Sequence, residues 1–230
     1  MCNDPMLPRP PQRPAPDERE IEWQLATDDL APVRRWLEAH RTVNGLQIAP
    51  LPAQRLQDTY LDTPDWRVFR SGFALRVRQG AGPSEATLKS LRSARADLAD
   101  RQEVTETLTG AVTDPAGAPG SVGAWLRLVL GDRPLRVLFV VHTRRERFAV
   151  HGSGRPTPIG EIALDETVVR APSEVPLERL LRVEVEVRGG NPQALASLVE
   201  ALQRSCRLRP ARENKFAAGV RAAALAPPLD

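Results

Sequence analysis

The chain has 230 residues, of which 41% are hydrophobic and 27% charged, a composition typical of globular proteins rather than of disordered or fibrous ones. It has no apolar run of the roughly eighteen residues that span a membrane, and its N-terminus lacks the apolar core of a secretory signal. Its net charge is only +3, and its two cysteines are too few for a disulfide framework. We therefore expect a cytoplasmic protein that binds neither membrane nor nucleic acid.

The basic residues are almost all arginine. Lysine occurs only at Lys89 and Lys215, among 32 lysines and arginines together. A bias of this strength reflects genome composition, and it should have replaced lysine wherever arginine serves equally well. Because lysine is a compact point charge and arginine a planar fork, the two do not exchange freely at a crowded site. Lys89 and Lys215 are therefore candidates for functional positions.

Residues 1–18 contain six of the 22 prolines and little hydrophobic pattern, so we expect a disordered tail there and a single domain over residues 19–225. Alternating polar and apolar residues predict strands at residues 20–25, 53–62, 73–79, 85–91, 102–109, 135–150, 157–170 and 181–188. Helices are expected at residues 27–40, 122–130, 191–204 and 212–225, with a helical turn at 65–70 closed by Gly72.

Several predicted strands carry charges of one sign on one face. These pairs are Glu20 and Glu22, Arg76 and Arg78, Arg145 and Arg147, and Glu184 and Glu186. A solvated sheet face also alternates in this way, but it tends to mix the signs along a strand. Because helices with apolar stripes are available to cover the other face, we favour an α+β fold. We expect an eight-stranded antiparallel barrel with a charged lumen and helices outside.

The charges of such a lumen need compensation, because buried like charges are costly unless they are paired or bound. Carboxylates suit a hard divalent cation, and arginine and lysine suit phosphate oxygens. Both in one cavity indicate a metal-bound polyphosphate. An open nucleic-acid-binding sheet would need aromatic residues on the basic strands, and only 4% of the chain is aromatic.

Nine short motifs occur in an order and at a spacing that match a known family. They are residues 20–24 (EIEWQ), 60–65 (YLDTPD), 74–78 (ALRVR), 87–89 (TLK), 101–103 (RQE), 143–148 (TRRERF), 163–166 (ALDE), 184–186 (EVE) and 214–216 (NKF). In these motifs the chain resembles the CYTH superfamily, the triphosphate tunnel metalloenzymes. This superfamily includes inorganic triphosphatases, thiamine-triphosphatases and class IV adenylyl cyclases. The resemblance covers residues 19–220, and both lysines fall on positions where the family has lysine.

The resemblance implies a metal-dependent triphosphatase that takes a triphosphate-containing small molecule and acts as a monomer or homodimer. Substrate contacts would come from Arg76, Arg78, Lys89, Arg145, Arg147 and Lys215. Mg²⁺ or Mn²⁺ would be held by Glu22, Glu103, Asp165, Glu184 and Glu186. Glu20, Glu22 and Gln24 fall on the catalytic signature of the first strand. The reaction would be in-line attack of water on the terminal phosphoryl group of inorganic tripolyphosphate or a related organic triphosphate.

Two positions depart from the family pattern. Gln24 stands where the opening signature has lysine, and Thr105 stands where a second carboxylate often follows Glu103. Glu106 has the wrong strand parity to replace that carboxylate. These departures leave open a second hypothesis, a module that binds triphosphate, polyphosphate or nucleotide without hydrolysing it. A third, cyclisation of ATP, would need a base-recognition pocket that the sequence does not reveal.

Overall fold

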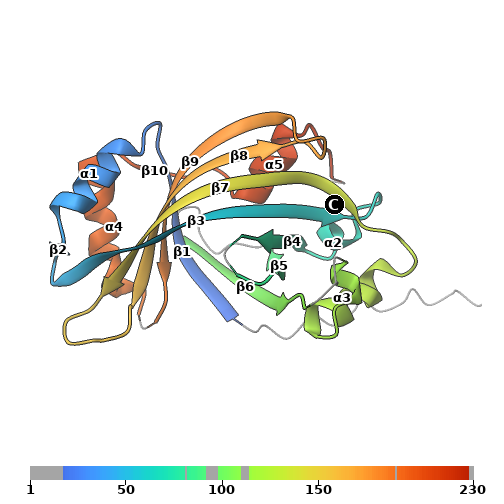
Figure 1. Ribbon diagram of the computed structural model, residues 1–230, viewed down its shortest axis with the longest axis horizontal. Helices are drawn as coiled ribbons and strands as arrows, with labels where there is room; N and C mark the ends of the chain where they lie inside the picture. Colours follow the sequence, from blue (N-terminus) through green and yellow to red (C-terminus); the bar gives the residue numbers. More distant parts are fainter. Residues whose placement is uncertain (1–17, 81, 92–97, 110–113, 190, 228–230) are drawn as a thin grey trace, which may run out of the picture.

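The computed structural model describes residues 18–227 except 81, 92–97, 110–113 and 190. Its long strands are β1 (Glu18–Ala26), β3 (Leu46–Asp62), β4 (Phe73–Gln79), β5 (Glu85–Ser90), β6 (Leu98–Thr107), β7 (Arg136–His151), β8 (Gly160–Arg170) and β9 (Pro176–Val187). They pair antiparallel in the order β1-β6-β5-β4-β3-β7-β8-β9, and β9 pairs with β1 (Figure 1). The predicted eight-stranded closed barrel is therefore confirmed. Residues 1–17 of the expected tail lie outside the described residues, while Glu18 already belongs to β1.

Several strand ends differ from the sequence-based prediction. β3 begins at Leu46 instead of residue 53, because two prolines that normally argue against a strand are tolerated near a break in register between Leu51 and Gln54. β9 begins at Pro176 instead of residue 181, pairing with the end of β8. β6 begins and ends earlier than expected, and β8 begins later, at Gly160. Two short strands were not predicted: β2 (Thr42–Val43), which pairs with β3, and β10 (Arg209–Pro210), which pairs with β1.

The helices lie close to their predicted positions. They are α1 (Ala31–Ala39), α2 (Arg67–Arg70), α3 (Ser121–Leu130), α4 (Gln193–Cys206) and α5 (Lys215–Ala222), with a short 3₁₀ helix, η1 (Pro115–Gly117). α5 begins later than predicted because the Asn214 side chain accepts the Ala217 N–H at 2.8 Å and so caps the helix. Gly72 follows α2 with a φ of +85°, a backbone conformation that favours glycine.

Helices cover the outside of the barrel at two places (Figure 1). α1 and α4 pack on the outward side chains of β1, β8 and β9, such as Leu25, Ile162 and Val183. α2 and α3 pack on β4, β5 and β6, where Leu88 and Trp125 belong to a second apolar cluster. Because these apolar side chains point outward under helices, the alternate residues of the same strands point inward.

Helix α5 packs differently from α1 to α4. Its Phe216 lies near the Tyr60 and Phe139 rings, with centroids 5.7 and 6.1 Å away, and Phe139 lies on the same face of β7 as Arg145. A Cβ on Gly219 would lie 2.1 Å from the Phe139 ring, so only glycine allows this close approach. α5 therefore packs against inward-facing side chains at one end of the barrel.

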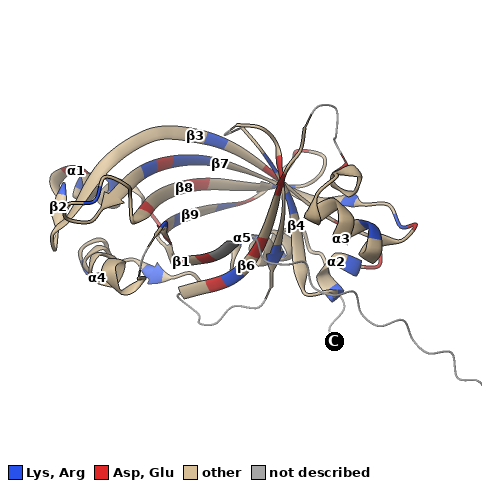
Figure 2. Cartoon of the chain, turned by 90° about the horizontal axis from the view of Figure 1, so that it is seen from below, with Lys and Arg blue, Asp and Glu red and all other residues tan. Residues whose placement is uncertain are grey.

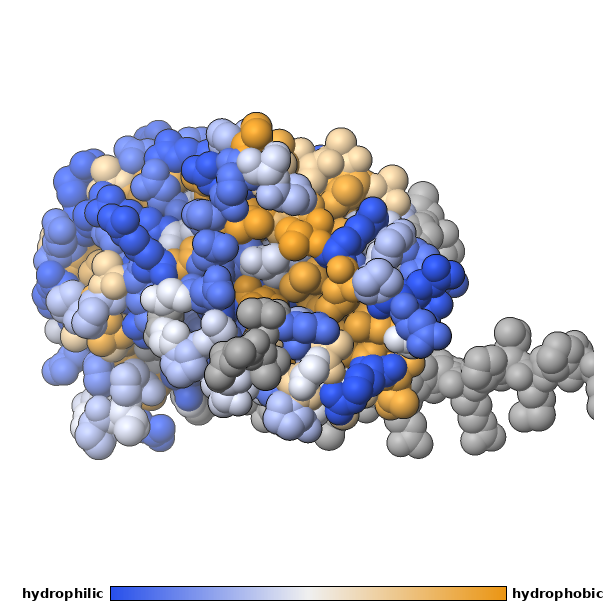
Figure 3. Space-filling model, turned by 45° about the vertical axis from the view of Figure 1, so that its right-hand side comes forward, coloured by the Kyte–Doolittle hydropathy of each residue, from blue (hydrophilic) through white to orange (hydrophobic). Residues whose placement is uncertain are grey.

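The surface is uneven in polarity. In the view of Figure 3, hydrophilic residues dominate the left of the molecule, and apolar residues gather at the centre and right. Val137 and Leu177 are among the exposed large apolar residues, and both line a groove of about 410 Å³ beside residues 222–225. Among the helices that the structure describes, none combines the length and the apolar character needed to cross a membrane.

Candidate functional site

A charged cavity of about 540 Å³ lies inside the barrel. It is lined by Glu20, Glu22, Gln24, Tyr60, Ala74, Arg76, Arg78, Glu85, Lys89, Ser90, Leu91, Arg101, Glu103, Thr105, Arg145, Glu184, Glu186, Arg188, Asn214, Lys215 and Phe216. Charged residues follow one another along β1, β6 and β7, as Figure 2 shows. The period-two alternation of the strands brings together here most of the residues that the sequence singled out.

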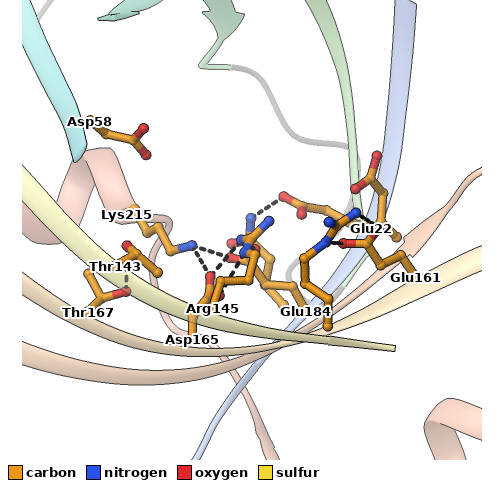
Figure 4. A network of polar contacts seen from close by, with 12 residues as sticks. Glu22, Asp58, Thr143, Arg145, Glu161, Asp165, Thr167, Glu184 and Lys215 are labelled. Atoms are coloured by element: carbon orange, nitrogen blue, oxygen red, sulfur yellow. Dashed lines mark hydrogen bonds and ion pairs between the residues drawn. The ribbon is translucent and has the colours of Figure 1, made fainter. Parts of the chain in front are cut away.

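One side of the cavity holds anchored cations. Asp165 is fully buried on β8 and accepts two hydrogen bonds from the Arg145 guanidinium, at 2.8 and 2.6 Å (Figure 4). Glu184 accepts a third from Arg145, at 2.6 Å. Lys215 donates to Asp165 at 2.5 Å and lies 2.9 Å from Glu184. Burial lowers the pKa of Lys215, but Asp165 and Glu184 raise it overall, so the ammonium stays charged.

A second anchor was not predicted from the sequence. Asp58 on β3, which is 1% exposed, accepts two hydrogen bonds from Arg78, both at 2.7 Å, and lies 3.9 Å from Arg76. Although burial raises the pKa of Asp58, the two arginines hold it well below its usual range. Asp58 lies two residues before Tyr60 on β3 and therefore on the same strand face, which is the sequence signal that could have identified it. We call Arg76, Arg78, Arg145 and Lys215, with their anchors Asp58, Asp165 and Glu184, the cation wall.

The other side of the cavity is rich in carboxylates. We define the carboxylate wall as Glu20, Glu22, Glu103 and Glu186, together with Lys89 and Arg101. Lys89 lies 3.1 Å from Glu20 and forms an ion pair with Glu103. Burial raises the pKa of Glu103 to about 7; Lys89 opposes this rise and Glu20 adds to it.

Glu22 and Glu186 lie directly opposite each other on β1 and β9. Burial raises the pKa of Glu22, and repulsion from Glu20 and Glu184 adds to the rise. Burial also raises the pKa of Glu186 to about 7, with Glu20 reinforcing it against the charge of Arg188. These carboxylates therefore repel one another in a buried place.

The structure places all of the predicted site residues around the cavity except Asp165 and Arg147. Asp165 lies behind the cavity surface, where it anchors Arg145 and Lys215. Arg147 forms a double hydrogen bond with Glu161, at 2.8 and 2.7 Å, and is not among the lining residues. Its substrate contact stays a prediction.

Two further details concern the departures from the family pattern. Thr105 lines the cavity and shares a hydrogen bond of 3.2 Å with Thr87. Two neutral hydroxyl groups therefore occupy the position where the family often has a carboxylate. Glu106 points outward, as its parity predicts, and accepts the backbone N–H groups of Gly120 and Gly123 at the start of α3. Arg101, Arg188 and Glu85 also line the cavity, and the sequence motifs assigned none of them a role in the site.

Comparison with known proteins decides the family. The model of the CYTH domain matches residues 34–220, most of the chain. The chain belongs to the CYTH family. No curated protein matches the chain in sequence.

Solved structures that resemble this CYTH chain share little sequence with it. HpAC1 of Hippeastrum, described as an adenylyl cyclase candidate with a dominant triphosphatase activity, is 16% identical with a TM-score of 0.61, over 88% of this chain and 95% of that one. The adenylate cyclase candidate bh2851 of Bacillus halodurans is 20% identical with a TM-score of 0.58, over 86% and 96% of the two chains. PH1819 of Pyrococcus horikoshii is 17% identical with a TM-score of 0.54, over 88% and 98%. At these identities the likeness shows the shared CYTH fold.

The carboxylate wall fits the metal that the CYTH resemblance implies. Glu20, Glu22 and Glu186 offer only oxygen donors, which Mg²⁺ and Mn²⁺ prefer. Glu22 and Glu186 lie opposite each other, and burial raises the pKa of both, so a bound cation would stabilise their charged forms. As the side chains of the described residues lie, no three Asp, Glu, His or Cys form a group ready to hold a metal ion. Glu22 is engaged by Arg101 and Gln24, so metal binding there requires these contacts to rearrange.

Proposed function

We propose that the chain hydrolyses the terminal phosphoryl group of inorganic tripolyphosphate or a related organic triphosphate, with a divalent metal ion. The observation that carries this proposal is the cation wall, where Arg78, Arg145 and Lys215 are fixed by buried carboxylates around one cavity. Anchored cations lose little freedom when they bind an anion, and a polyphosphate offers several oxygens to such a set. CYTH membership supports the same substrate class.

The metal would be held by the carboxylate wall, with Glu22 and Glu186 as the first choice of ligands and Glu20 and Glu103 beside them. Bound there, Mg²⁺ or Mn²⁺ would neutralise phosphate charge and lower the pKa of a water molecule. Asp165 and Glu184, expected among the ligands, are engaged with Arg145 and Lys215, which supports an anchoring role for both.

The residues of the chain itself would work mainly by position and charge. The cation wall would hold the phosphate oxygens so that the terminal phosphoryl group faces the carboxylate wall. Charge that develops on the transferred group and the leaving phosphates would be stabilised by Arg78, Arg145 and Lys215, which need no rearrangement during the reaction. Glu20 and Glu22 would orient the attacking water by accepting its hydrogen bonds.

The test is phosphate release from tripolyphosphate with Mg²⁺, with Mn²⁺ and with EDTA. We expect metal-dependent release that falls at least about a hundredfold in Arg78→Ala and Glu22→Gln, because each change removes a charge at the reacting groups. Arg144→Ala and Glu166→Gln are matched controls, because both residues lie on the opposite strand face from Arg145 and Asp165. Release that persists in EDTA, or that the controls lose equally, would contradict the proposal.

A binding module without turnover is the second candidate. It is favoured by Gln24, whose neutral side chain donates to Glu22 where the family signature has a cation. The same assay separates the two: a melting temperature raised by tripolyphosphate without phosphate release would establish binding alone. Cyclisation of ATP would release pyrophosphate instead of phosphate. A cytoplasmic location and a monomeric or homodimeric state stay predictions.

An organic substrate is supported by the apolar part of the cavity. Tyr60, Ala74, Leu91 and Phe216 line it together, beside the first turn of α5. Such side chains suit a planar apolar group attached to the triphosphate. Comparison of kcat/KM for tripolyphosphate and a heterocyclic triphosphate, in the wild type and in Leu91→Ser, would show whether these residues select the organic part.

A further inference from the structure

Arg101 is a buried cation of the cavity that the sequence motifs did not assign. It lies on β6 directly opposite Glu20, and its side chain is 7% exposed. Its Nη2 donates to Oε1 of Glu22 at 2.6 Å and lies 4.0 Å from Oε2 of Glu20. It therefore joins both carboxylates of the first strand.

The same oxygen of Glu22 also accepts a hydrogen bond from Gln24. Oε1 of Glu22 is the acceptor for Nε2 of Gln24 as well as for Nη2 of Arg101. A lysine at position 24 would bring its ammonium close to Oε1 of Glu22, to which Arg101 already donates a hydrogen bond. Of these two donors, Arg101 carries the charge.

Arg101 also keeps hydrogen-bonding capacity for a ligand. Its Nε is buried and has no hydrogen-bond partner among the described residues, and the same holds for Nε of Arg76, which lines the same cavity. A guanidinium has five N–H donors in a planar fork, a geometry that matches phosphate oxygens. Buried donors normally have acceptors, so both guanidinium groups keep donor capacity for an anion bound in the cavity that they line.

We propose that Arg101 is a substrate-binding residue that supplies the phosphate-binding charge which position 24 does not provide. The inference deepens the proposed function and rests on it. A purely structural Arg101, needed only to neutralise Glu22, would affect stability and not the affinity for tripolyphosphate. The two roles therefore differ in what a substitution changes.

The experiment measures tripolyphosphate binding by calorimetry, and phosphate release with Mg²⁺, for the wild type and three variants. Arg101→Gln should weaken binding by about tenfold to a hundredfold, the usual effect of losing a hydrogen bond to a charged group. Gln24→Lys alone should change affinity less than about threefold, because the new ammonium meets Arg101 at the same oxygen. Gln24→Lys with Arg101→Gln should regain most of the lost affinity.

Two matched controls and a conservative variant keep the result interpretable. Gln102→Ala changes the neighbouring exposed residue of β6, and Arg144→Gln removes the same charge from the outer surface; both should bind as the wild type does. Arg101→Lys keeps the charge without the fork and should fall between the wild type and Arg101→Gln. If Arg101→Gln does not fold, the tripolyphosphate affinities of the double variant and of Arg101→Lys test the role of Arg101 instead.

Failure of this inference differs from failure of the proposed function. A wild type that binds no tripolyphosphate overturns both. A wild type that binds, while Arg101→Gln binds equally well or the double variant regains nothing, overturns only the role of Arg101. A large rise in affinity from Gln24→Lys alone also overturns it, since position 24 would then be an unfilled cation site.

Discussion

The two walls of the cavity use charge in opposite ways. In the cation wall, each cation is held by a carboxylate with little or no exposure, and Arg78 and Arg145 form double hydrogen bonds with Asp58 and Asp165. In the carboxylate wall, Lys89 and Arg101 pair with Glu20, Glu22 and Glu103, and Glu186 pairs with Arg188 at 3.0 Å. Burial raises the pKa values of Glu103 and Glu186 to about 7.

The difference shows what each wall needs from a ligand. The cations of the cation wall are already held by buried carboxylates, so the wall presents fixed donors to an anion without reorganisation. The carboxylate wall has excess negative charge in a buried place, so a bound divalent cation would relieve its repulsion. Three substitutions test this contrast through the free energy of unfolding, and they follow from the largest expected effect to the smallest.

The largest effect is expected for Asp165→Asn. The change removes one of the two buried carboxylates that hold Arg145 and Lys215 and leaves only Glu184. Breaking a buried ion pair by removing one partner typically costs about 3–5 kcal/mol. Urea unfolding with EDTA measures the loss, and Glu166→Gln, the next residue of β8 on the outer face, is the matched control. A loss below about 1 kcal/mol would mean that Arg145 and Lys215 do not depend on Asp165.

Glu186→Gln should have a smaller effect that depends on pH. Because folding raises the Glu186 pKa from 4.5 to about 7, the native protein holds a proton that the unfolded chain releases, and wild-type stability falls as pH rises between these values. The glutamine variant lacks this loss, so its free energy of unfolding relative to wild type should improve by about 2 kcal/mol from pH 5 to pH 8. Denaturant titrations in EDTA measure it.

Glu200→Gln, an exposed change on α4, is the control for that measurement and should show no such trend. An equal difference between Glu186→Gln and wild type at both pH values would mean that neither burial nor the neighbouring glutamates raise the pKa of Glu186 on folding.

The smallest effect is expected for Glu146→Gln. Glu146 follows Arg145 on β7 but pairs on the outer face with Arg34, whose side chain is 38% exposed. Solvent screens such pairs, so the loss should lie between about 0 and 1 kcal/mol. Thermal unfolding at low and high salt measures it, and a loss as large as that of Asp165→Asn would remove the contrast between the two faces of the strand.

Much of the barrel was predictable because strand alternation is local. Glu20 and Glu22, or Arg76 and Arg78, face the same side whatever their neighbours are. These same-sign pairs, together with helices able to cover the apolar face, indicated a charged lumen. The start of β3 was not predictable, since two prolines conceal a strand that a break in register accommodates. Nor was the packing of α5 against inward-facing residues, which depends on the approach of Gly219 to Phe139.

The sequence by itself determined the strand faces, the family and most of the charged residues of the cavity. Only the tertiary structure decided which charges meet: Arg101 reaches Glu22 from 79 residues away, and Lys215 reaches Asp165 from 50 residues away. The physical reason is that side-chain direction follows from the local period of a strand, whereas ion pairing follows from the register between strands. That register is set by the closure of the whole barrel.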